Sequence, residues 1–158
     1  MVKGADIVAL GRIVRAEPGR VEGKTEPDGW ADRVYYVYVT VEVERVIAGQ
    51  VPGSEVVVQF ISPDPSTFAA QLRAFPSERA LFFLNDLVRS LTDGGRRTPD
   101  PELAKLQGIY EWTVPGSVVR NMDGVARPLV YWGDGYARAL DGRPFDDVVA
   151  EVVRLAGS

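Results

Sequence analysis

The chain contains neither cysteine nor histidine. Their absence excludes Ser-His-Asp and Cys-His catalysis in their usual forms, thiolate and haem sites, and ordinary zinc sites. It also removes the side chain that most often switches charge near neutral pH. The commonest catalytic and metal chemistries are therefore excluded, and the sequence predicts no metal, no cofactor and no enzymatic activity.

Long apolar runs and a basic excess are also missing. No segment reaches the ~18 consecutive apolar residues of a membrane helix. The start, MVKGADIVALGRIVRAEP, is interrupted by Gly11 and Arg12 and lacks a cleavage site, so it predicts a strand and not a signal peptide; any export signal would lie outside this chain. The net charge of −4, with only Arg96 and Arg97 adjacent, makes nucleic acid an unfavourable partner.

The clearest positive signal is a long alternating segment from Arg33 to Ile47. Because side chains alternate across a strand, it predicts one apolar and one polar face. Its length is about twice that of a common strand, which favours a curled strand in a small antiparallel barrel. The apolar face would hold Tyr35, Val37, Val39, Val41 and Val43, and the other face Tyr36, Tyr38, Thr40, Glu42 and Glu44.

The remaining pattern predicts a single mainly β domain over residues 1–158. A first strand over 6–16 contains Gly11, which is typical of a bulge or bend. A terminal helix over 144–156 carries an apolar stripe of Phe145, Val148, Val149, Val152 and Leu155. Further strands are expected over 55–61, 79–84 and 109–114, and a hairpin over 117–129 with a type I turn at Asn121–Gly124. A Gly/Pro-rich loop is expected over 17–32. One or two helical turns are expected over 66–74, and an irregular stretch over 85–107 with a loop at 93–102.

Several of these segments resemble a known family when taken in order. They are DIVALGRIV with Gly11 and Ile13, the strand end from Val43 to Gly49, the segment from Gly53 to Val58, and the aromatic strand from Leu81 to Leu84. This pattern is similar to the OB-like barrel domains of uncharacterised bacterial envelope proteins, which have a netrin-like or TIMP-like fold.

The resemblance implies a small antiparallel OB-like barrel with the C-terminal helix packed on it. It also implies an extracytoplasmic location, secreted or attached to the envelope, with another protein or an envelope component as partner. The inhibitory animal relatives chelate the metal of a protease through an N-terminal cysteine. This chain has no cysteine, so that activity is not carried over.

Aromatic side chains provide the candidate binding residues. Trp30, Tyr36 and Tyr38 would form an exposed surface that stacks bases or sugars, or else simply pack under a helix or loop. Arg96 and Arg97 lie in the predicted loop and would contact an acidic partner or solvent. A second aromatic set would form a platform or pack locally around turns: Tyr110, Trp112, Tyr131, Trp132 and Tyr136.

Carboxylates are the remaining chemical candidates, because a facing pair can hydrolyse a glycosidic bond. Most of them fall in turns or at helix starts, where backbone hydrogen bonding explains them: Asp64, Asp100, Glu102, Asp123, Asp134, Asp146 and Asp147. Three hypotheses follow: a non-catalytic extracytoplasmic interaction or structural module, an OB-type binder of oligosaccharide or single-stranded nucleic acid, and a small carboxylate-dependent hydrolase.

Overall fold

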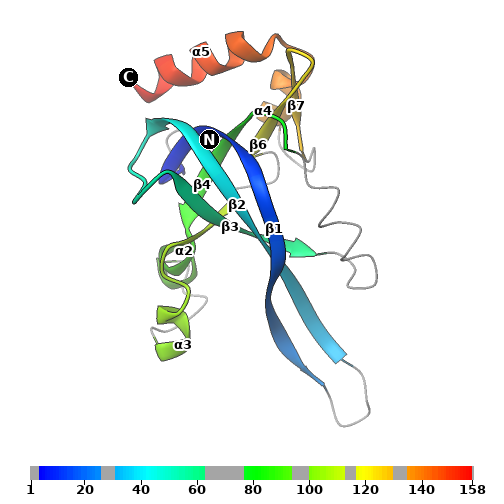
Figure 1. The fold of residues 1–158 in the computed structure, drawn as a ribbon, viewed down its shortest axis with the longest axis vertical. Coiled ribbons are helices and arrows are strands. Elements are labelled where there is room, and N and C mark those ends of the chain that lie inside the picture. The colour runs from blue at the N-terminus through cyan, green and yellow to red at the C-terminus, as the bar shows by residue number, and fades with distance from the viewer. Residues whose placement is uncertain are drawn as a thin grey trace.

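The computed structural model describes residues 4–25, 31–62, 77–93, 100–112, 117–129 and 135–157. The described part is mainly β, as the sequence predicted, with short helices between and after the strands (Figure 1). The elements in chain order are β1 (Ile7–Thr25), β2 (Ala31–Ala48), β3 (Glu55–Ser62), β4 (Ala80–Asp86), α2 (Leu87–Asp93), α3 (Pro101–Ala104), β5 (Ile109–Trp112), β6 (Val118–Met122), β7 (Val125–Pro128), α4 (Gly135–Leu140) and α5 (Phe145–Ala156).

The strands form one seven-stranded sheet in the order β1-β2-β3-β5-β4-β6-β7. Strand β1 also pairs with β4, so β1, β2, β3, β5 and β4 form a ring. Strands β3 and β5 are parallel, which corrects the prediction of a purely antiparallel sheet. The reason lies in the connection: α2 and α3 carry the chain from the end of β4, and β5 then enters between β3 and β4.

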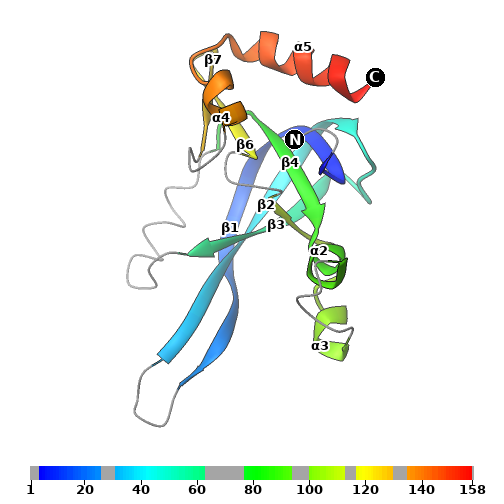
Figure 2. The same ribbon diagram turned by 180° about the vertical axis from the view of Figure 1, so that it is seen from behind.

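Strands β1 and β2 form a long hairpin, paired from Val8↔Ala48 to Thr25↔Ala31. Its outer part extends away from the body at the end opposite α5 (Figures 1 and 2). The predicted loop over 17–32 is therefore wrong for residues 17–25, which continue β1, and for residues 31 and 32, which begin β2; its positions 26–30 lie outside the described residues. Strand β1 accommodates Pro18 by a register shift between Pro18 and Val21, and proline is tolerated at strand edges and bulges.

The ring encloses the main hydrophobic core. Val37, Val39 and Val41 from β2 are at most 1% exposed, which confirms the apolar face predicted from the alternation. Gly11 is required where β1 curls: the register shifts between Leu10 and Gly11, and a Cβ atom at Gly11 would collide with the backbone carbonyl of Glu42. The other core side chains are Ile7, Ala9, Ile13, Val56, Val58, Phe60, Ala80, Phe82, Leu84, Tyr110 and Val118.

Helix α5 covers a second core on the outer side of β1 and β4. Phe145, Val148 and Val152 are buried against a cluster that includes Leu81 and Phe83 from β4. The predicted packing of the terminal helix on the sheet is confirmed. Pro144 stands at its N-cap, and two exposed aspartates occupy its first turn, where carboxylates interact favourably with the helix dipole.

Helices α2, α3 and α4 were not predicted from the sequence. The first two lie within the stretch expected to be irregular, and Leu87, Leu103 and Leu106 form a third small core beneath them. Asp100 caps α3, because its carboxylate accepts a hydrogen bond of 2.7 Å from the Leu103 amide. The predicted loop over 93–102 is therefore wrong at both ends, because Asp93 ends α2 and positions 101 and 102 begin α3. Its positions 94–99 lie outside the described residues.

The β6–β7 hairpin is confirmed, but its turn type differs from the prediction. Asp123 has a φ of 54° and Gly124 a φ of 83°, and two positive φ values are typical of a type I′ turn. The Asn121 side chain accepts a hydrogen bond of 2.8 Å from the Gly124 amide. The helical turns predicted over 66–74 lie outside the described residues.

Candidate ligand-binding groove

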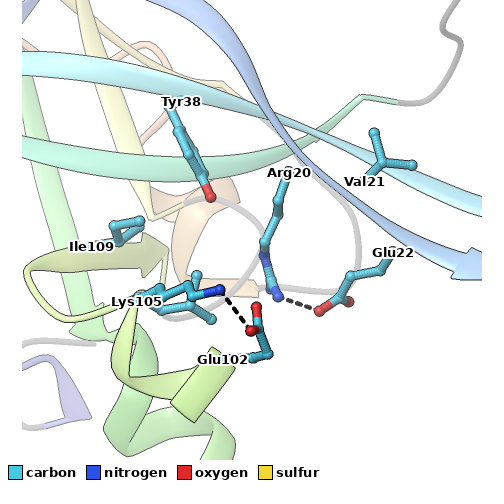
Figure 3. Close-up of a pocket in the computed structure, with 8 residues that line it drawn as sticks. Arg20, Val21, Glu22, Tyr38, Glu102, Lys105 and Ile109 are labelled. Atoms are coloured by element: carbon cyan, nitrogen blue, oxygen red, sulfur yellow. Dashed lines mark hydrogen bonds and ion pairs between the residues drawn. The ribbon is translucent and has the colours of Figure 1, made fainter.

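Two adjoining cavities lie between the outer part of the β1–β2 hairpin, which we call the arm, and the helices that follow β4. The larger has a volume of about 370 Å³ and the smaller about 120 Å³, and Arg20 and Glu22 line both. We refer to the two together as the groove; Figure 3 shows the larger cavity. The larger cavity is lined by Arg20, Val21, Glu22, Tyr38, Glu102, Lys105, Leu106 and Ile109, and the smaller by Arg20, Glu22, Tyr36, Gln59, Ile61, Leu87, Leu91, Glu111 and Trp112.

Side chains on the outer face of the sheet form one side of the groove. Tyr36 and Tyr38 are two residues apart on β2, so their side chains lie on the same face. Gln59 on β3 and Glu111 on β5 stand opposite each other in the parallel register. Arg20 on β1 and Glu102 on α3 both line the larger cavity, although they are about 80 positions apart in the sequence. The fold brings them to opposite walls.

Arg20 is held from three sides at the centre of the groove. Its guanidinium lies 4.5 Å from the ring centroid of Tyr36, and its Nε donates a hydrogen bond of 2.7 Å to the side-chain oxygen of Gln59. It also forms an ion pair with Glu22. Gln59 is itself only 5% exposed. A side chain fixed in this way loses little conformational entropy when a ligand binds.

Tyr36 joins the same network through its hydroxyl, which donates a hydrogen bond of 3.0 Å to Glu22. Burial raises the pKa of Tyr36, and the hydrogen bond to Glu22 and the negative charge of Glu22 raise it further. One face of the ring is occupied by Arg20. Tyr36 therefore orders the groove and does not offer that face to a base or sugar.

The opposite wall is formed by α3 and the turn that follows it. Lys105 and Glu102 form an ion pair of 2.6 Å, and Leu106 and Ile109 provide apolar surface. Figure 3 shows the Tyr38 hydroxyl, the Arg20 guanidinium and the Lys105–Glu102 pair directed into the same space. The groove therefore has an apolar floor with both charge signs at its walls.

The carboxylates of the groove each have a partner. Glu22 pairs with Arg20, Glu102 pairs with Lys105, and Glu111 accepts a hydrogen bond from the Ser90 hydroxyl. Within the described ranges, no group of three or more acidic side chains is arranged to hold a metal ion. This arrangement suits recognition by shape and hydrogen bonding.

The structure places only part of the predicted binding surface. Tyr36 and Tyr38 are both half-buried and both line the groove. Trp30, Arg96 and Arg97 lie outside the described residues, so the predicted grouping with them is not tested. Sequence reasoning missed Arg20, Val21, Glu22, Gln59 and Lys105; the available signal was the alternation of Arg20 and Glu22 in a segment assigned to a loop.

The other candidates occupy mainly structural positions where they are described. Asp100 caps α3, Asp123 lies in the β6–β7 turn, and Asp146 and Asp147 begin α5. Tyr110 is buried in the ring. Trp112 packs edge-on against Phe60 with ring centroids 4.3 Å apart and also lines the smaller cavity of the groove. Asp64, Asp134, Tyr131, Trp132 and the side chain of Tyr136 lie outside the described part of the chain.

Comparison with known proteins gives no assignment: no protein-family model, curated protein or solved structure matches this chain. No helix in the described ranges is long and apolar enough to cross a lipid bilayer.

Proposed function

We propose that this chain is a non-catalytic interaction module, built on an OB-like barrel, that binds a segment of a partner protein in the groove. The observation that carries the proposal is the groove itself, with Arg20 pre-ordered between Tyr36, Gln59 and Glu22. The five-stranded ring supports the barrel, and a volume of about 370 Å³ falls within the range of ligand pockets.

A polypeptide fits the chemistry of the groove better than the alternatives. Nucleic acid needs unpaired cations along its path, whereas Arg20 and Lys105 are each paired with a carboxylate. A sugar would use an open aromatic face, and Arg20 covers one face of Tyr36. A peptide can use the apolar floor through one side chain and the polar walls through its backbone.

The absence of a catalytic role belongs to the same proposal. Hydrolysis by two carboxylates needs one that is protonated and one that is free to attack or to activate water. Glu22, Glu102 and Glu111 each hold a basic or hydroxyl partner. Purified protein should therefore show no activity on generic glycosidase, esterase, phosphatase and protease substrates. Turnover abolished by a single Asp or Glu substitution would overturn this part.

The binding test presents the immobilised chain with a displayed library of random short peptides, a panel of bacterial cell-wall oligosaccharides, and a single-stranded oligothymidine. We expect enrichment of peptides. Val21→Asp should weaken the selected peptide by about tenfold or more, because it adds a charge where the edge of β1 borders the larger cavity. Val21 is 53% exposed, so the fold tolerates the change.

The matched control is Val46→Asp, which changes a residue on β2 that is 37% exposed and does not line the groove. It should leave peptide affinity unchanged. Binding of the oligosaccharide or of oligothymidine at the groove, without peptide binding, would replace the proposal by the OB-type alternative. Equal effects of Val21→Asp and Val46→Asp would show that the groove is not the binding site.

The extracytoplasmic location is part of the proposal and comes from the family resemblance alone. Fusing the complete native gene to alkaline phosphatase, which folds to an active enzyme only outside the cytoplasm, tests it. An inactive fusion that is nevertheless produced in full would contradict the location and leave the binding proposal standing.

A further inference from the structure

The outer edge of β1 is open next to the groove. Strand β4 pairs with β1 only from Ile7 to Gly11. From Arg12 to Thr25, β1 pairs with β2 on one side, and within the described ranges no strand pairs with its other side. An open strand edge presents backbone N–H and C=O groups that can pair with another chain.

The two parts of this edge differ. The part up to Pro18 contains the proline and a register shift between Ile13 and Arg15, and such features discourage strand pairing. After the shift between Pro18 and Val21, the register with β2 is uninterrupted from Val21 to Thr25. The usable part of the edge is therefore the part that reaches the groove.

Gly23 lies in the middle of that usable part. It is exposed and has a φ of 105°, a backbone conformation that residues with a side chain rarely adopt. A glycine inside a strand often marks a place where another backbone approaches closely.

The edge adjoins the larger cavity directly. Three consecutive residues of β1, namely Arg20, Val21 and Glu22, line it. Successive side chains of a strand point to opposite faces. Because three successive residues line this cavity, it borders the strand at its edge as well as at one face. A chain lying along this edge would place side chains in the cavity.

We propose that the β1 edge from Val21 to Thr25 binds the partner segment as an added strand, with alternate side chains of that segment entering the groove. This inference rests on the proposed function and specifies its mode. Backbone hydrogen bonds would supply affinity and the groove would supply selectivity, as in other cases of strand addition.

The groove also defines the chemistry of the occupant. Leu106 and Ile109 form its apolar surface, which suits one large aliphatic or aromatic side chain. The Arg20–Glu22 and Lys105–Glu102 pairs balance their charges, so an uncharged segment needs no compensating group. The occupant is therefore an extended, uncharged segment of another protein with an apolar anchor.

The test uses a peptide selected on the intact chain, resynthesised with one N-methyl group at each position in turn. In either strand orientation, alternate residues direct their N–H groups to the neighbouring strand. We expect losses of about tenfold or more at every second position and small changes at the positions between. The method modifies only the peptide, so the folding of the chain is not affected.

Hydrogen exchange of the intact chain with and without the same peptide gives the second readout. Strand addition predicts new protection of amides within residues 21–25. Uniform tolerance of N-methylation, or protection confined to residues 102–109, would overturn the inference. If Val21→Asp still weakens binding in that case, the groove remains the site and only the strand mode fails. A concentration-dependent dimer that excludes the peptide would assign the edge to a second copy and also overturn it.

Discussion

The two parts of β1 differ in burial and in the strands that flank them. From Ile7 to Leu10 every side chain is at most 2% exposed, because β2 and β4 flank the strand and both of its faces meet apolar cores. From Arg12 onward β2 is the only strand of the described ranges that flanks it. There Arg12 and Arg15 are exposed, and Val14 is 49% exposed.

Under the proposed function, this difference puts fold stability at one end of the molecule and recognition at the other. The α5 end buries side chains in two layers, whereas the arm end holds a groove whose walls are polar contacts and ion pairs. Substitutions at the two ends should therefore separate into those that unfold the chain and those that change only binding.

The largest effect is expected at α5. Phe145→Ala should lower the free energy of unfolding by about 3–5 kcal/mol, because Phe145 is 1% exposed and packs in the second core. The measurement is urea unfolding followed by fluorescence. Val14→Ala, in the exposed part of β1 after Arg12, is the control. Its free energy of unfolding should stay within about 0.5 kcal/mol of that of the unchanged chain. Equal losses for the two variants would contradict the division between the ends.

The next effect is expected at the bend between the two parts of β1. Gly11→Ala should destabilise the chain by about 1–3 kcal/mol, since the added Cβ atom meets the carbonyl of Glu42 and backbone cannot move aside cheaply. Gly53→Ala is the matched control, because its Cβ atom would have nothing within 4 Å. A shift in thermal midpoint for Gly53→Ala as large as for Gly11→Ala would remove the steric explanation.

A smaller effect is expected inside the groove. Tyr36→Phe removes the hydrogen bond to Glu22 and should cost about 0.5–1.5 kcal/mol. Glu22 keeps Arg20 as a partner, so no carboxylate is left unpaired. The loss should be clearly smaller than that of Phe145→Ala in the same urea unfolding experiment.

The same variant also has a defined pH dependence. The pKa of Tyr36 is raised by burial first and then by Glu22, and that of Tyr110 is raised by burial, Asp86 and Asp6. The folded state therefore retains these protons more strongly than the unfolded state. Their contribution is complete below about pH 10, the ordinary tyrosine value, and falls as the pH rises through the raised values. Tyr36→Phe should make the alkaline decline shallower, and an unchanged decline would refute the assignment.

The sequence predicted the body of the fold because its patterns are regular there. The alternation of β2 matches the burial of Val37, Val39 and Val41, and the stripe of α5 matches the burial of Phe145, Val148 and Val152. These patterns arise because one face of each element meets a core, and a single core leaves a periodic signal.

The arm and the groove escaped prediction for a physical reason. Glycine and proline between residues 17 and 32 are typical of loops, yet pairing with β2 supplies backbone partners that propensity alone does not reveal. Tyr36 and Tyr38 were recognised as candidates. Their neighbours Glu102 and Lys105 come from a helical turn distant in sequence, and no local pattern places them beside the arm.

The smallest effect on stability is expected at the wall of the groove that α3 and the turn after it form. Lys105→Ala should change the free energy of unfolding by less than about 0.5 kcal/mol. The Lys105 and Glu102 side chains are 67% and 68% exposed, and an ion pair in solvent contributes little to stability. If an uncharged segment occupies the groove, the variant should also weaken peptide binding less than Val21→Asp does. Loss of binding comparable with Val21→Asp at unchanged stability would instead assign Lys105 a direct contact with an acidic group of the partner. Urea unfolding and peptide titration of this one variant therefore show whether the outer wall only shapes the groove or recognises charge.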